Sequence, residues 1–276
     1  MLKFIEKHAK VIVVLAVMAG STSGIFGSVI TAPSMFIGFA RLIISLPIFG
    51  LPVLLNRRDE LKRLKKGDVM WSALAGFFLF AHFFTWFNAV KLTNVASAAV
   101  LASLHPLVVL AVTVFIFRKK VSLKSVAAII AALGGGCVIA GLDYASLTSG
   151  ALAGDIYAFC AGIFMGLYFA IGNHVRKNVP GDIYVFILFA SCALCFTIGM
   201  VATGTPVSGY PVTDYIYIAA LTIVCQVCAH AVFNMCIGHV DSLYVSAWES
   251  GESVFAIILG IIFLMEPMRG LEPLTC

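Results

Sequence analysis

The chain has 276 residues, of which 61% are hydrophobic and 11% charged, with a mean hydropathy of +1.05 and a formal net charge of +5. Soluble domains are about 45–50% apolar and about 25% charged, so this composition excludes a soluble globule and a disordered chain. The basic residues stand in short clusters between apolar runs instead of in one patch with interleaved aromatic residues, so no nucleic-acid partner is expected.

Long apolar runs predict an all-α integral membrane protein in contact with membrane lipid. A spanning helix needs about 20 apolar residues, because each backbone polar group must be satisfied within the segment. The runs are too long for the strands of a membrane barrel, which have about 10 residues of alternating pattern. The sequence predicts nine spanning helices, near 10–30, 34–55, 69–90, 94–117, 122–141, 151–173, 182–203, 213–237 and 242–265.

The basic residues predict the orientation. With loops numbered alternately, fifteen Lys and Arg residues fall on the side of the N-terminus and two, Lys91 and Arg269, on the other. Cytoplasmic loops carry the excess of Lys and Arg, so the N-terminus is expected in the cytoplasm of a multi-pass cell (inner) membrane protein. A cleaved signal peptide over 1–20 is the alternative, although apolar residues continue through Ile30.

Two halves of the chain show a weak internal repeat. Ala81-His82 aligns with Ala229-His230, and 103–120 then aligns with 250–267 at an offset of 147 residues. A first unit of five helices, an odd number, obliges the second unit to enter the membrane the opposite way up, which is the inverted repeat of many secondary transporters. We therefore predict units at 1–147 and 148–276.

The repeat also predicts a helix that is not there. The run at 122–141 should have a counterpart near 269–288, whereas the sequence ends at Cys276. The second unit is therefore expected to hold four helices and a short tail, either because the natural chain is shortened or because the sequence is truncated or frameshifted.

Several motifs resemble those of the EamA-type branch of the drug/metabolite transporter superfamily, whose members carry two inverted five-helix units. They are Arg41 in FARLIISLP, His105-Pro106-Leu107, Gly134-Gly135-Gly136, Gly154-Asp155, Glu252-Ser253 and Glu266. Lys119, where the family often has Glu, and Ser253, where it has Pro, are departures. The resemblance implies a transporter with a central cavity and no enzymatic activity.

Ionisable residues inside the apolar runs are the candidate binding or coupling residues. Each costs about 2.5–3.5 kcal/mol at bilayer depth, so they are expected to face a wet cavity or one another. They are Arg41, His82, His105, His230, Glu249 and Glu252. The two glutamates are three apart on one helix face and repel when both are charged, which suits proton-coupled or cation-coupled exchange. Structural pairing within the bundle is the alternative.

Further residues extend this candidate site. Trp86 follows His82 by four residues and Trp248 precedes Glu252 by four, so each tryptophan is expected to lie on the same helix face as that residue. Asn88 is expected to add a polar group near Trp86. Pro106 is expected to kink its helix beside His105 and to act in gating. Gly162 and Gly166 are interpreted as packing positions.

Signatures of bound cofactors and catalytic metals are absent from the sequence, which contains no GxxxxGK[ST] loop and no HExxH. No cofactor or metal site is expected. The favoured hypothesis is a secondary exporter of small polar metabolites such as amino acids, working by alternating access; a homodimer and a coupling proton or cation stay open. A non-transporting receptor or scaffold, or a defective truncated relative, is the alternative.

Overall fold

The computed structural model describes residues 2–123, 126–127, 129–131, 134 and 152–264, and this part is helical without a strand. Seven of its segments are long and apolar enough to cross a membrane: His8–Val29, Ser34–Asn56, Lys66–Leu92, Val95–Ile116, Leu152–Val175, Gly181–Thr203 and Val212–Cys236. They correspond to seven of the nine predicted runs. The predicted helix at 122–141 and the tail beyond 264, with Gly135, Gly136 and Glu266, lie largely or wholly outside the described residues.

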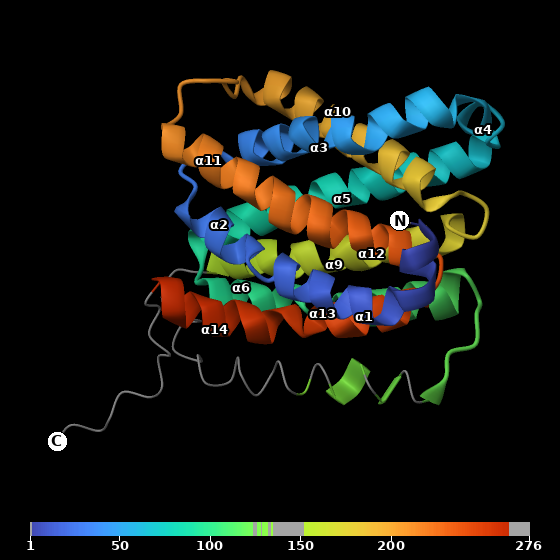
Figure 1. The fold of residues 1–276 in the computed structure, drawn as a ribbon. Helices are drawn as coiled ribbons and strands as arrows, with labels where there is room; N and C mark the ends of the chain where they lie inside the picture. The colour runs from blue at the N-terminus through green and yellow to red at the C-terminus, as the bar shows by residue number, and fades with distance from the viewer. Residues whose placement is uncertain (1, 124–125, 128, 132–133, 135–151, 265–276) are drawn as a thin grey trace.

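The helices lie roughly side by side (Figure 1). In chain order they are α1 (Leu2–Gly20), α2 (Ser23–Val29), α3 (Ser34–Asn56), α4 (Arg58–Lys62), α5 (Lys66–Leu92), α6 (Val95–Ala102), α7 (His105–Ala111), the π-helix η1 (Val112–Ile116), α9 (Leu152–Val175), α10 (Gly181–Thr203), α11 (Val212–Leu221), the π-helix η3 (Thr222–Ala231), α12 (Val232–Cys236), α13 (Ser242–Ser250) and α14 (Glu252–Leu264).

Three of the predicted runs fold as broken helices. The breaks lie between α1 and α2, between α6 and α7, and at Gly251 between α13 and α14. Pro106 lies at the start of α7, where a proline has no intrahelical hydrogen bond to lose. The α-helix is interrupted just before it, at Ser103 and Leu104, whose backbones keep right-handed helical dihedral angles. The ninth predicted run thus consists of two helices that are each too short to span a membrane.

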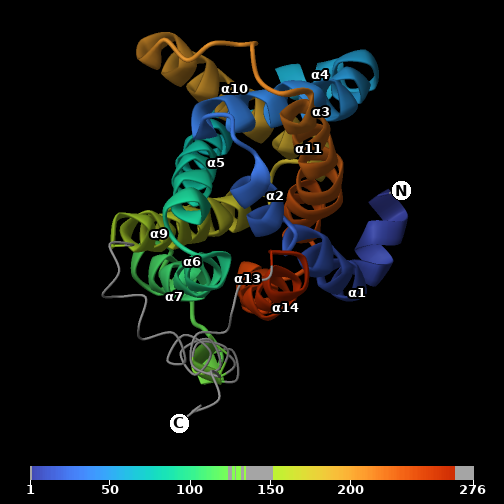
Figure 2. The same cartoon turned by 90° about the vertical axis from the view of Figure 1, so that its left-hand side faces the viewer.

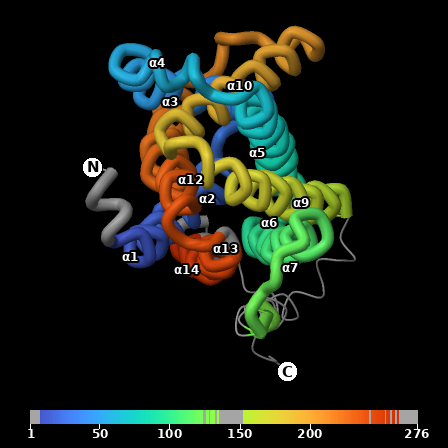
Figure 3. The backbone as a smooth tube through the Cα atoms, turned by 90° about the vertical axis from the view of Figure 1, so that its right-hand side faces the viewer, coloured from blue at the N-terminus to red at the C-terminus, as the bar shows by residue number. Residues whose placement is uncertain are grey.

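The segments that carry the basic clusters gather at one end of the bundle. α4 and the connections after η1 and α9 lie at the end where N is marked (Figure 1). Arg57, at the end of α3, binds the carboxylate of Asp182 at the start of α10, with Nη1 2.5 Å from Oδ1. Viewed along the helices, α5, α9, α6, α14, α1 and α11 surround α2 (Figures 2 and 3).

Small residues allow α9 to approach the break between α6 and α7 closely. A Cβ atom at Gly162 would lie 2.7 Å from the backbone oxygen of Ala102, and one at Gly166 would lie 2.7 Å from that of His105. Both glycines therefore lie at a helix contact, as the sequence predicts. This contact fixes the position of His105 relative to α9.

We expect Gly162→Ala to destabilise the protein by roughly 1–3 kcal/mol, because the added methyl group would overlap a backbone atom that cannot rotate away. The thermal unfolding midpoint in one detergent measures this effect. Gly67→Ala is the matched control, since a Cβ there meets nothing within 4 Å. Equal midpoints for the two variants would contradict the close helix contact.

Candidate functional site

A cavity lies where the broken helices meet α3, α5 and α9. The space between its walls is about 550 Å³ when the opening to solvent is counted. It is lined by Ser23, Arg41, His82, Phe83, Trp86, Ala99, Ala102, Ser103, His105, Met165, His230, Glu249, Glu252 and Ala256. Polar groups and aromatic rings thus share one pocket.

Seven of the residues singled out in the sequence line this cavity together. They come from α3, α5, α7, η3, α13 and α14, and they are Arg41, His82, Trp86, His105, His230, Glu249 and Glu252. Residues as distant in sequence as Arg41 and Glu252 therefore border the same space. Such clustering is expected, because ionisable groups are costly in free energy where they face lipid and therefore face the interior of the bundle.

Arg41 is a buried cation whose surroundings are aromatic. Its side chain is 1% exposed, and its Cζ lies 4.1 Å from the ring centre of Phe83 and 5.5 Å from that of Phe87. It forms no ion pair with any residue that the structure describes, and its Nε and Nη2 lack hydrogen-bond partners there. The aromatic faces stabilise the charge in part, and two N–H groups remain to bind an anion.

His105 and Glu249 meet across the contact between α7 and α13. Nε2 of His105 lies 3.4 Å from Oε2 of Glu249 and 3.1 Å from the carbonyl oxygen of Ser246, and Nδ1 lies 3.1 Å from that of Ala102. The two side chains are 4% and 3% exposed. Acceptors therefore face both ring nitrogens of a buried histidine.

Glu252 also lies near the end of α1. Its Oε2 lies 3.3 Å from the position that a Cβ of Gly20 would occupy, at the end of α1. The two carboxylates still interact electrostatically. Both carboxylates line the same cavity, and each has further neighbours of its own.

His82 and His230 lie closer to the aromatic side of the cavity. Their ring centres are 6.0 Å apart. Nδ1 of His82 lies 2.9 Å from the Ala161 carbonyl oxygen, and Nδ1 of His230 lies 3.4 Å from the Tyr168 hydroxyl. A neutral ring with one N–H satisfies each of these contacts.

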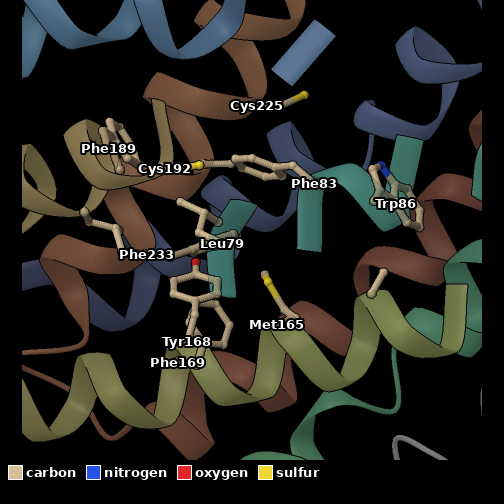
Figure 4. Close-up of a cluster of buried hydrophobic side chains, with 14 of the residues drawn as sticks. Leu79, Phe83, Trp86, Met165, Tyr168, Phe169, Phe189, Cys192, Cys225 and Phe233 are labelled. Atoms are coloured by element: carbon tan, nitrogen blue, oxygen red, sulfur yellow. The ribbon is translucent and has the colours of Figure 1, made fainter. Parts of the chain in front are cut away.

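Tyr168 and Met165 were not singled out in the sequence. Both rise from α9 toward Leu79 and Phe83 of α5 (Figure 4). Tyr168 is fully buried, and its hydroxyl also accepts a hydrogen bond from Asn234 at 3.4 Å. The sequence did offer a signal for Tyr168, because a tyrosine in the apolar run at 151–173 is expected to be buried and a buried hydroxyl needs a polar partner.

Three predicted residues lie outside the cavity lining. Trp248 is 44% exposed and contacts the ring of Tyr244. The prediction that it shares a side with Glu252 is wrong, because α13 ends at Ser250 and Glu252 begins another helix. Asn88 donates a hydrogen bond to the Phe84 carbonyl oxygen of its own helix at 2.7 Å. Pro106 is buried at the start of α7, beside the cavity but not in its wall.

Comparisons with known proteins agree with this architecture. The EamA-like transporter family matches residues 9–141 and again 152–274. The uncharacterized transporter YxxF of Bacillus subtilis (strain 168) is 27% identical over 177 residues, which cover 63% of this chain and 57% of that protein, just over half of its length. The uncharacterized transporter YcbK of the same organism is 22% identical over 243 residues, 86% of this chain and 78% of that protein.

A crystal structure of another protein has the same fold. It superposes with a TM-score of 0.74 at 18% identity, over 95% of this chain and 90% of the other. The apolar spans and two family matches that together cover most of the sequence identify a multi-pass membrane protein. The chain belongs to the EamA-like transporter family.

Proposed function

We propose that this protein is a secondary transporter of small zwitterionic metabolites, with amino acids as the leading class, and that it works by alternating access through the central cavity. Opposite charges without full partners inside one buried cavity carry this proposal. Within the described part of the chain, hydrogen-bond partners are missing for two nitrogens of Arg41, for Nε1 of Trp86 and for both oxygens of Glu249. Such groups are costly in a bilayer unless a ligand satisfies them.

A zwitterion offers one charged group to each sign of charge in the cavity. Its carboxylate would accept hydrogen bonds from the planar fork of Arg41 and from Trp86, while its ammonium group would bind the carboxylate of Glu252. The rings of Phe83 and Trp86 would pack against an apolar side chain. An acid without the amine, or an amine without the acid, leaves one end of the cavity unsatisfied.

Movement of two units against each other would expose the cavity to each side in turn. The units are 1–147 and 148–276 in inverted orientation, and the twofold family match supports this division. Ser250 Oγ donates a hydrogen bond to the Ser103 carbonyl oxygen at 3.0 Å, joining two residues that are 147 apart. This spacing equals the repeat offset found in the sequence, which favours a symmetric crossing of the two broken helices.

The direction of transport that we propose is export across a cell (inner) membrane with the N-terminus in the cytoplasm. The concentration of Lys and Arg at one end of the bundle supports that orientation. A cysteine introduced at Arg58 and another at Gly209, in opposite connections, test it by labelling intact cells with a membrane-impermeant thiol reagent. Labelling of Gly209→Cys alone supports the orientation, and labelling of Arg58→Cys alone contradicts it.

Counterflow tests the proposed function. Purified protein in liposomes loaded with unlabelled amino acids should take up labelled neutral, basic or acidic amino acids at least about tenfold faster than liposomes without protein. The deaminated acid and the decarboxylated amine of the best substrate should compete at least about tenfold more weakly, because each lacks one charged end. No exchange of any panel member by folded protein would favour a non-transporting receptor or scaffold.

A further inference from the structure

Two helix ends of the same polarity converge on His105. α6 ends at Ala102 and α13 ends at Ser250, and each contributes a carbonyl oxygen near the ring of His105. His105 lies 3.1 Å from the Ala102 oxygen of one and 3.1 Å from the Ser246 oxygen of the other. Helix C-termini carry partial negative charge and favour a cation, and interrupted half-helices bind coupling ions in this way in other transporters.

The hydrogen-bond chemistry of His105 distinguishes it from the other cavity histidines. A neutral imidazole has one N–H and one lone pair, so it can satisfy an acceptor at only one nitrogen. Both nitrogens of His105 face carbonyl oxygens, and Nε2 also faces Glu249. His82 and His230 have contacts that the neutral ring meets in full. His105 is therefore the cavity histidine whose hydrogen bonds are all satisfied only when both ring nitrogens carry a proton.

The charge balance of the cavity leads to the same residue. Of the described residues that line it, Arg41 is cationic and Glu249 and Glu252 are acidic, so one negative charge is uncompensated when both carboxyl groups are ionised and the histidines are neutral. A bound zwitterion adds no net charge. One proton on His105 balances the cavity, and a buried net charge is costly in a bilayer.

We propose that His105 and Glu249 form a proton-binding site that fastens α7 to α13, and that its proton is the coupling ion of the transport function proposed above. The proton adds to the Nε2 lone pair, and the ring then donates to Glu249 and Ser246 while Nδ1 donates to Ala102. Loss of that proton sets a lone pair against carbonyl oxygens and loosens the crossing of the broken helices. Glu252 is then the carboxylate that binds the ammonium group of the substrate.

The groups that surround His105 are known from each neighbouring element. Glu249 faces it from α13, and Glu252 on α14 acts through Glu249. His82 on α5 is close enough for electrostatic interaction, and α9 contributes the ring of Phe169, 6.1 Å away, and Tyr168 next to it. Glu249 is thus the acidic group in direct contact with the ring among the described residues.

Histidine NMR tests the site without any substrate. The full chain, labelled with ¹⁵N-histidine and held in lipid nanodiscs, should show His105 passing from one protonated ring nitrogen to two between pH 8 and pH 5, while His82 and His230 keep one. His105→Gln assigns the signal among the six histidines. Glu249→Gln should displace the titration by about one pH unit or more, and Glu252→Gln, the matched control, should displace it less, because Glu252 acts on the ring only through Glu249. Unchanged signals from the other histidines show that each variant is folded.

Three results would overturn the proposal: a neutral His105 throughout this range, a doubly protonated His105 throughout it, or a signal that responds to sodium ions at constant pH instead of to pH. The measurement does not depend on transport, so its failure is distinct from failure of the counterflow assay. With a substrate from that assay, an outward proton gradient, from an acidic lumen to a more alkaline bath, should accelerate uptake about tenfold in the parent, because a proton-coupled exporter exchanges the two. In Glu249→Gln the ratio of gradient-driven to counterflow rate should fall to about one, whereas Glu60→Gln, on the exposed α4 outside the cavity lining, should keep it.

Discussion

Replacement of Arg41 by methionine is expected to reduce counterflow by about 100-fold without lowering the thermal stability of the protein. The guanidinium offers Nε and Nη2, both without hydrogen-bond partners in the described structure, to a substrate carboxylate. Hydrogen bonds to charged groups contribute about 1.5–3 kcal/mol each, and about 2.8 kcal/mol corresponds to a factor of 100. Methionine keeps the apolar contact with Phe83 and removes a buried charge that forms no ion pair with any described carboxylate, so the folded state loses little.

Arg41→Lys separates charge from geometry. Lysine retains the positive charge but lacks the planar fork, so we expect transport between that of the parent and that of Arg41→Met. Counterflow rates and thermal unfolding midpoints, measured on the same preparations, give both quantities. A large loss of stability in Arg41→Met with unchanged transport would assign Arg41 to the structure of the bundle and remove it from the binding site.

The composition of the cavity could be largely predicted from the sequence because the bilayer makes ionisable residues conspicuous. Arg41, His82 and Glu252 stand alone in long apolar runs, and a charge at that depth is stable only in the interior of the bundle. No knowledge of the tertiary structure was needed to expect that such residues face inward. Which of them contact one another could not be predicted, since those contacts depend on the packing of separate helices.

Predictions that relied on an unbroken helix failed where the helix is broken. Trp248 and Glu252 are four residues apart, which places them on one face only if the helix continues through Gly251. The sequence predicted one helix near 10–30, and the structure contains the break between α1 and α2 there. Pro106 did signal its break, because proline has a known local effect on a helix.

The partner at the other end of the cavity is Glu252, and Glu252→Gln is expected to reduce counterflow about 10-fold to 100-fold. Glutamine has nearly the same shape but cannot neutralise a substrate ammonium group, which removes a charge-assisted hydrogen bond of about 1.5–3 kcal/mol. Glu60→Gln is the control, because Glu60 lies on the exposed α4, where its hydrogen bonds to Arg57 lower the pKa of its carboxyl group. Transport by the control should equal that of the parent.

Selectivity gives the sharper measurement, because it does not depend on the absolute rate. Glu252→Gln should accept the deaminated acid of the best substrate almost as well as the amino acid, while Arg41→Met should accept the decarboxylated amine almost as well. Each variant thus loses discrimination at the end of the substrate that its missing charge would bind. If Glu252→Gln transported at the parent's rate and with the parent's selectivity from about pH 5 to pH 8, Glu252 would have no part in recognition, and the zwitterion would need another partner for its ammonium group.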